Sequence, residues 1–179
     1  MAIPIIILAG GKSSRMGRDK LSLPYGGSTL LARRVSEFTA CFPLVYLSVA
    51  AENAYSEIDC ARVVDEVRNL GPMGALYSAL RQLPDAPGLM LCAGDMPYAG
   101  AEAARDLLKF AEARDYDAVW AEPTFAYYAK SVLPLVEARI AAGNYKLRSL
   151  FPELNSARFE LPKHALFNVN TPEDYARLS

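Results

Sequence analysis

A loop rich in glycine and basic residues follows the first apolar run of the sequence. Gly10 and Gly11 come directly after Ile5–Leu8, a run typical of a strand that is buried on both faces. Glycines at such a point let backbone N–H groups approach an anion closely. Residues 12–20 contain four cations and one acid: Lys12, Arg15, Arg18, Lys20 and Asp19. A triphosphate is the natural counter-charge for this loop, and a solvated basic loop is the alternative.

Two carboxylates follow later apolar runs. Asp95 comes after Leu89–Ala93, at the carboxyl end of a predicted strand. There it can hold Mg²⁺, which needs only one or two carboxylates beside phosphate oxygens and water. Asp95 can also be read as a helix N-cap, for which aspartate is favoured. Asp65 ends a shorter predicted strand and can either bond a ribose hydroxyl or cap a turn.

Two further segments have residue types that suit a ligand. Residues 70–75 open a predicted helix with small side chains, which leaves room for a nucleobase or sugar, although tight helix–sheet packing explains them nearly as well. Asn168 and Asn170 are two residues apart on a strand predicted over 165–169, so both amides would point to one face. Turn and cap chemistry before the last helix is the alternative for these asparagines.

Strands and helices must alternate to position these loops. Apolar runs predict strands over 5–8, 44–49, 62–65, 89–93, 117–121, 125–129, 158–161 and 165–169. Amphipathic spacing predicts helices over 30–38, 71–83, 101–113 and 132–142, with a short helix opened by residues 171–174. This order indicates an α/β sandwich with a mostly parallel sheet, in which ligands bind beyond the carboxyl ends of the strands. One domain is expected over 1–179.

Composition excludes several classes of protein. The chain has 179 residues, 52% of them hydrophobic, and a formal net charge of -1, which disfavours a basic nucleic-acid binder. The lone histidine, His164, excludes a multi-histidine metal site. The cysteines Cys41, Cys60 and Cys92 are odd in number and form no CxxC pair, which favours reduced thiols in the cytoplasm. The first apolar run is too short to span a membrane and lacks the basic region of a signal peptide.

Taken in order, these motifs resemble one enzyme family. The segment from Leu8 to Lys20 reads Leu-Ala-Gly-Gly-x-Ser-x-Arg-Met-Gly-x-Asp-Lys, and residues 168–173 read Asn-x-Asn-Thr-Pro-Glu. Both are similar to the molybdenum cofactor guanylyltransferases, also called molybdopterin-guanine dinucleotide synthase protein A. The resemblance extends from Ile5 to about Tyr175. It implies a Rossmann-like three-layer α/β/α sandwich of the nucleotide-diphospho-sugar transferase type.

The resemblance also implies a reaction and a set of roles. GMP would pass from GTP to the terminal phosphate of molybdopterin, with Mg²⁺ present and pyrophosphate released. The nucleotide would contact Leu8, Ala9, Gly10, Gly11, Lys20, Asp65 and Asp95. Arg15, Lys20 and Asp95 would be catalytic, Asp95 would hold the metal, and Asn168 and Asn170 would lie on the pterin side. Molybdoenzymes or their chaperones would be further partners of a monomer that binds neither nucleic acid nor membrane.

Three alternatives remain open at this point. A related transferase could use CTP in place of GTP, because base selection rests largely on backbone contacts. Another could act on a sugar or alditol phosphate. A nucleotide-binding protein without turnover is the third, although Arg15, Lys20 and Asp95 are all present. Two positions depart from the family pattern: Ser48 falls where Asn is frequent, and Glu122 is an unusual neighbour for an anionic pterin.

Overall fold

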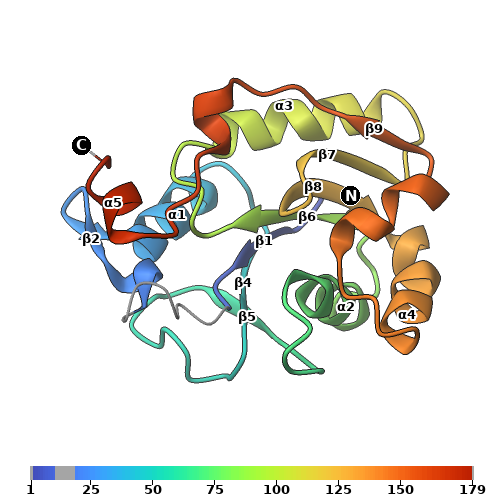
Figure 1. The fold of residues 1–179 in the computed structure, drawn as a ribbon, viewed down its shortest axis with the longest axis horizontal. Helices are drawn as coiled ribbons and strands as arrows, with labels where there is room; N and C mark the ends of the chain where they lie inside the picture. Colours follow the sequence, from blue (N-terminus) through green and yellow to red (C-terminus); the bar gives the residue numbers. More distant parts are fainter. Residues whose placement is uncertain (1, 11–18, 179) are drawn as a thin grey trace.

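A seven-stranded sheet runs through the part of the chain that the computed structural model describes, residues 2–10 and 19–178. Its strands lie in the order β5-β4-β1-β6-β8-β7-β9 (Figure 1). They are β1 (Ile5–Leu8), β4 (Val45–Val49), β5 (Ala61–Val64), β6 (Gly88–Ala93), β7 (Ala118–Glu122), β8 (Phe125–Ala129) and β9 (Ser156–Arg158). Neighbouring strands are parallel except at β8, which is antiparallel to β6 and β7. The mostly parallel sheet that the sequence predicted is confirmed.

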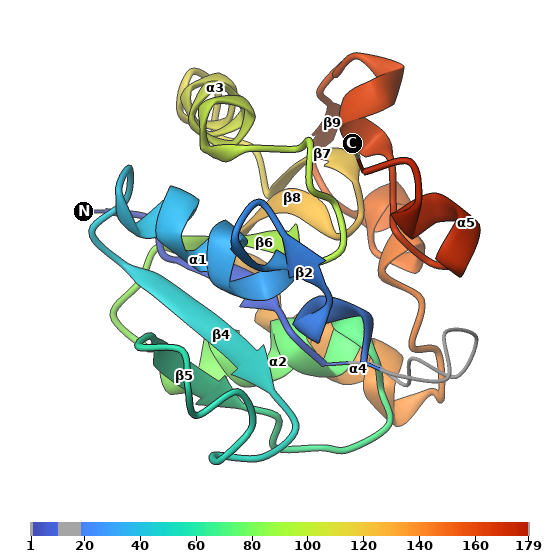
Figure 2. The ribbon, with the colours of Figure 1, turned by 90° about the vertical axis from the view of Figure 1, so that its left-hand side faces the viewer.

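Helices cover both faces of this sheet. On one face lie α1 (Leu30–Thr39) and α3 (Ala101–Glu112), and on the other lie α2 (Pro72–Gln82) and α4 (Leu133–Ala141) (Figure 2). Short elements complete the fold: the hairpin strands β2 (Pro24–Tyr25) and β3 (Ser28–Thr29), the helix α5 (Pro172–Tyr175), and 3₁₀ turns at Lys20–Ser22, Lys130–Val132, Leu147–Ser149, Phe151–Glu153 and Lys163–Leu166. The predicted three-layer α/β/α sandwich is therefore confirmed.

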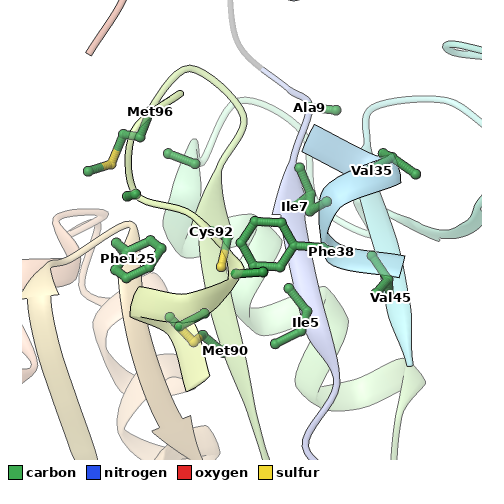
Figure 3. Packing of buried hydrophobic residues seen from close by; sticks show 14 of the residues in the cluster. Ile5, Ile7, Ala9, Val35, Phe38, Val45, Met90, Cys92, Met96 and Phe125 are labelled. Atoms are coloured by element: carbon green, nitrogen blue, oxygen red, sulfur yellow. The ribbon is translucent and has the colours of Figure 1, made fainter. Parts of the chain in front are cut away.

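The core divides into two clusters because side chains of β1 alternate between the faces of the sheet. Ile5 and Ile7 pack toward α1 and α3, whereas Ile6 packs toward α2 and α4. Phe38 of α1 is fully buried and lies against Ile7 and Cys92 (Figure 3). Residues on both faces of β1 are thus fully enclosed, as its unbroken apolar run predicted.

The order of the strands creates a switch point beside β1. The chain leaves β1 through α1 to reach β4 and β5, and then returns through α2 to β6 on the opposite side of β1. Where the connections from two adjacent parallel strands leave in opposite directions, a crevice forms between the carboxyl ends of those strands, here β1 and β6. The loops after β1 and β6 therefore meet at one place.

The prediction of a strand over residues 165–169 is wrong. Residues 163–166 form a 3₁₀ turn, and residues 167–170 have no sheet partner. The apolar side chains of this segment pack onto the core without a backbone ladder, so burial alone accounts for the pattern. The strand predicted at 158–161 overlaps β9 only at Arg158, because β9 begins at Ser156 and ends at Arg158. Within the described residues, no helix has the length and apolar character needed to cross a membrane.

Leu47 offers a test of the core. Its side chain in β4 is fully buried, and Leu47→Ala should lower the free energy of unfolding by about 2–5 kcal/mol. Leu44→Ala is the matched control, because Leu44 is 37% exposed and should change stability by less than about 1 kcal/mol. Urea unfolding followed by circular dichroism measures both values, and equal losses would contradict the assignment of Leu47 to the core.

Candidate functional site

Two adjoining cavities form a groove at the carboxyl end of β1. The first, of about 200 Å³, lies between β1 and β6, and the second, of about 500 Å³, lies between β1 and α2. Leu8, Gly10 and Pro72 line both cavities, so the two are continuous. This is the switch point of the sheet, where a ligand is expected in an open α/β fold.

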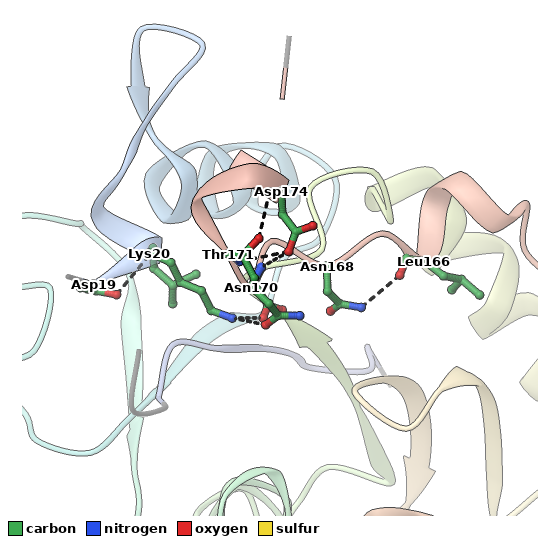
Figure 4. Close-up of polar contacts among 9 residues, drawn as sticks. Asp19, Lys20, Leu166, Asn168, Asn170, Thr171 and Asp174 are labelled. Carbon is green, nitrogen blue, oxygen red and sulfur yellow. Dashed lines mark hydrogen bonds and ion pairs between the residues drawn. The ribbon is translucent and has the colours of Figure 1, made fainter. Parts of the chain in front are cut away.

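An ion pair lies in the first cavity. Lys20 Nζ contacts the carboxylate of Asp95 and also donates to Asn170 Oδ1 at 2.9 Å (Figure 4). The Lys20 and Asp95 side chains are each only 19% exposed. Such a pair brings together a cation that can bind phosphate and a carboxylate that can bind a divalent metal. The pairing unites residues that are 75 positions apart in the sequence.

Asp19 sets the position of Lys20. Its carboxylate accepts a hydrogen bond from the backbone N–H of Leu21 at 3.1 Å and so caps the turn that begins at Lys20. The same carboxylate accepts from the hydroxyl of Tyr55 at 2.7 Å and from that of Ser22 at 3.0 Å. Burial and the bond to Asp19 raise the pKa of Tyr55, so its hydroxyl remains a donor at neutral pH.

The segment around Asn168 and Asn170 is attached to the same loop. Val169 N–H donates to the carbonyl of Asp95 at 2.9 Å. Thr171 and Asp174 form a capping box that begins α5, and Asp174 also accepts from the N–H of Asn170 at 3.0 Å. The hydrogen bonds from the Asn170 and Thr171 backbones hold the pKa of Asp174 below its usual value. Turn and cap chemistry therefore explains much of this motif.

The two asparagines do not share one face of a strand. Asn168 donates through Nδ2 to the carbonyl of Leu166 at 3.0 Å, whereas Asn170 accepts from Lys20 (Figure 4). Asn168 still lines the first cavity. The expectation of two parallel amides failed because the segment is irregular and the alternation of a strand does not apply to it.

Asp65 lies in the second cavity, beside Ser48 and Gly10. Ser48 donates from its hydroxyl to Asp65 Oδ1 at 3.2 Å, and the N–H of Asp65 donates to the carbonyl of Val49 at 2.9 Å. Partial burial raises the pKa of Asp65, and the bond from Ser48 acts in the opposite direction. Ser48 thus orients a carboxylate that faces the groove.

Most of the predicted site residues meet in this groove. The first cavity is lined by Leu8, Ala9, Gly10, Lys20, Asp95 and Asn168, and the second by Asp65. Gly11 and Arg15 lie outside the described residues, as do Lys12 and Arg18. Tyr55, Thr124 and Asn69 also line the groove, although their residue types and positions gave no signal in the sequence. These residues lie in connecting loops, and the position of such loops in space cannot be predicted from a local sequence pattern.

The carboxylate of Asp95 is the kind of ligand that suits a metal ion which takes most of its other ligands from a substrate. Within residues 2–10 and 19–178, no cluster of three or more His, Cys, Asp or Glu side chains could hold a metal by itself. Mg²⁺ is usually bound through one or two carboxylates together with phosphate oxygens and water. A single carboxylate in a partly enclosed cleft that also holds a cation able to bind phosphate fits that pattern.

The sequence matches the MobA-like NTP transferase domain over residues 5–158. The chain belongs to this family. A relative named probable molybdenum cofactor guanylyltransferase, from Carboxydothermus hydrogenoformans, is 32% identical over 98% of this chain and 94% of its own length. The family that the two sequence motifs indicated is thereby confirmed.

Two solved structures share this fold. A molybdopterin-guanine dinucleotide biosynthesis protein A from Archaeoglobus fulgidus superposes with a TM-score of 0.85 at 24% identity, covering 98% of this chain and 96% of that one. A manganese complex of Rv0371c from Mycobacterium tuberculosis superposes with a TM-score of 0.66 at 20% identity, covering 99% and 98% of the two chains. These likenesses confirm the nucleotide-diphospho-sugar transferase type of fold.

Gly94 and Gly10 should respond differently to alanine. A Cβ atom at Gly94 would lie 2.7 Å from the carbonyl oxygen of Leu8, whereas at Gly10 the nearest atom is Asp65 Oδ2 at 3.9 Å. Gly94→Ala should therefore lower the free energy of unfolding by about 1–3 kcal/mol, and Gly10→Ala should lower it far less. Thermal unfolding of the two variants compares them, and equal stability would show that β1 and β6 can separate without cost.

Asp65 should make folding less favourable at neutral pH. Because its pKa is raised in the folded chain, the folded state binds this proton more tightly than the unfolded state. Stability is therefore lost as pH rises from the ordinary pKa of aspartate through the raised one. Asp65→Asn should raise the free energy of unfolding at pH 7 and leave it nearly unchanged below the ordinary pKa. Urea unfolding across this pH range measures the effect, and Asp59→Asn, at an exposed aspartate, is the control.

Proposed function

We propose that the protein transfers GMP from GTP to molybdopterin, releasing pyrophosphate and forming the guanine dinucleotide form of the cofactor. The observation that carries this proposal is the pairing of Lys20 with Asp95 at the switch point of the sheet, in a chain of the MobA-like NTP transferase family. Relatives of nearly the same length are named for this activity. Together they favour a working transferase over a protein that only binds nucleotide.

The groove suits a nucleoside triphosphate in one orientation. The larger cavity, between Asp65 and the start of α2, suits the base and ribose, with Leu8 and Gly10 along one side and Ala9 in the adjoining smaller cavity. The smaller cavity holds Lys20 and suits the phosphates. The N-terminus of α2 at Pro72 borders both cavities, and the positive end of the helix dipole there favours negative charge.

Catalysis of this transfer requires mainly that the two substrates are positioned and that negative charge on the phosphates is stabilised. The terminal phosphate of molybdopterin is already anionic at neutral pH, so the attack on the α-phosphate of GTP needs little help from a base. Two polyanions must be brought together, and negative charge develops on the pyrophosphate as it leaves. Lys20 donates to phosphate oxygens when the nucleotide displaces its bond to Asp95. Arg15 and the N–H groups of Gly10 and Gly11 are proposed to act on the same charge.

Asp95 is proposed to hold Mg²⁺ once Lys20 has turned to the phosphates. The metal supplies Lewis-acid stabilisation of charge on the phosphate oxygens. Asp95 is suited to this role because its backbone carbonyl is fixed by Val169, and its side chain is directed at Lys20 in the cleft. Asn168 and Asn170, which flank Val169, are proposed to contact the pterin side of the acceptor.

The remaining partners follow from the reaction. GTP and molybdopterin are the proposed substrates, and molybdoenzymes or their chaperones are the proposed recipients of the product. We place the protein in the cytoplasm as a monomer, a location supported by the free thiols of Cys41, Cys60 and Cys92. Cys92 is fully buried, and burial raises its pKa to about 12, which keeps it an unreactive thiol.

Pyrophosphate release tests the proposal. The protein should release pyrophosphate when GTP, molybdopterin and Mg²⁺ are all present, and omission of any one should abolish release. Asp95→Asn should lower the rate by about 10²–10³-fold, and Lys20→Met by a similar factor. Lys163→Met is the control, because Lys163 is exposed on the 3₁₀ turn away from the cleft.

The nucleotide itself is tested in the same assay. CTP should not replace GTP if the base is read as proposed, and a sugar phosphate should not replace molybdopterin. Release with CTP alone among nucleotides would refute the guanylyl transfer. Full activity of Asp95→Asn would refute the assignment of the metal to Asp95.

A further inference from the structure

A buried arginine lies beneath the loop that holds Asp95. Arg34 of α1 is only 2% exposed, and its Nη1 donates to the carbonyl of Ala99 at 2.8 Å. Its guanidinium also stacks on the ring of Phe38, with 4.7 Å between the guanidinium carbon and the ring centroid. Ala99 belongs to the loop between β6 and α3, residues 94–100, which starts at the switch point and contains Asp95.

Glu37, one helical turn after Arg34, holds the other end of this loop. Its Oε1 accepts from the N–H of Ala101 at 2.7 Å, which satisfies a free donor at the start of α3. Its Oε2 lies 3.6 Å from Nη1 of Arg34. A Cβ atom at Gly100 would collide with this carboxylate, so a larger residue there would require the Glu37 side chain to move.

The arginine is poorly satisfied for a residue with a purely structural role. Among the described residues, neither Nε nor Nη2 of Arg34 has a hydrogen-bond partner, although both are buried. Replacing a buried charged group together with its partner by apolar side chains of similar volume is often neutral or stabilising, whereas removing one partner alone costs stability. An apolar pair at positions 34 and 37 would therefore serve the core of α1 at least as well. The charge needs another explanation, and the contacts of Arg34 lead to the 94–100 loop.

The cation also acts on the site through space. Burial lowers the pKa of Arg34, while electrostatic interactions with its neighbours, among them Glu37 and Asp95, raise it. The guanidinium and the Asp95 carboxylate therefore attract one another across the loop. Positive potential beneath the loop favours the anionic phosphates that the cleft is proposed to bind.

We propose that Arg34 and Glu37 are positioning residues that fix the 94–100 loop, and through it the carboxylate of Asp95, in the geometry that transfer requires. This inference rests on the proposed function, in which Asp95 holds the metal. Lys20 and Val169 hold Asp95 from the cleft side, and Arg34 and Glu37 hold its loop from beneath. Neither residue belongs to a motif of the sequence.

Kinetics of Arg34→Met provide the first test. The kcat for pyrophosphate release should fall by about 10–100-fold, because small displacements of a positioned group have effects of that size. The KM for GTP should stay within about twofold. The melting temperature should fall, because the carbonyl of Ala99 loses its donor and Glu37 loses its ion-pair partner. Arg34→Lys should recover part of the loss, since it restores a charged donor to Ala99. Arg33→Met is the control on the same helix, because Arg33 is exposed.

A double-mutant cycle separates positioning from general structure. If Arg34 acts through Asp95, Arg34→Met should lower kcat by less than about twofold in an Asp95→Asn background. An equal loss in both backgrounds would overturn the proposal, as would an Arg34→Met variant with the kcat of the parent. If Arg34→Met does not fold, Glu37→Gln enters the same cycle, and an unchanged kcat for that variant overturns the proposal.

Metal binding gives a readout that does not need turnover. The affinity for Mn²⁺ in the presence of GTP, followed by electron paramagnetic resonance, should fall about tenfold in Arg34→Met. A parent chain that binds Mn²⁺ but releases no pyrophosphate would refute the proposed function and leave this test intact. Unchanged Mn²⁺ affinity in both Arg34→Met and Glu37→Gln would refute the positioning role, whatever the activity of the parent.

Discussion

The structure depends on the close approach of β1 and β6 at the switch point of the sheet. The N–H of Gly94 donates to the carbonyl of Leu8 at 3.1 Å, which extends the parallel pairing one residue beyond the end of β6. Only glycine fits there, because a side chain at position 94 would meet the Leu8 carbonyl. The contact fixes the starting points of two loops, and those loops contain nearly all of the chemistry of the site.

Charge is concentrated at this contact although the chain as a whole is nearly neutral. The formal net charge is -1, yet Lys20, Asp95 and Asp65 all face one groove, and Arg34 lies beneath it. Partial burial strengthens each of these interactions relative to water. A site of this kind needs no histidine, because anionic phosphates need to be held and neutralised more than deprotonated. The single histidine, His164, lies on the surface.

The residues that line the cleft can be recognised in the sequence, whereas Arg34 and Glu37, which hold the 94–100 loop, cannot. Glycines, lysine and aspartates after apolar runs mark the cleft, because close backbone approach and charge demand those residue types. Arg34 and Glu37 look like ordinary polar residues of an amphipathic helix. Their importance arises from the packing of α1 against the 94–100 loop, in which residues about 65 positions apart come into contact. The stability lost at such positions is compensated by the large apolar core on both faces of β1.

The sequence by itself determined the alternation of strands and helices, the α/β class and the positions of Lys20, Asp65 and Asp95 at element ends. These follow from periodicity and from residue types that local backbone geometry requires. Only the tertiary structure decided the strand order, the antiparallel β8, the separate partners of Asn168 and Asn170, and the Arg34–Glu37 support. The strand expected at 165–169 is absent because burial against a neighbouring loop produces the same apolar pattern as a sheet. Contacts between segments that are far apart in the chain leave no local pattern in the sequence, so they can be identified only in the folded structure.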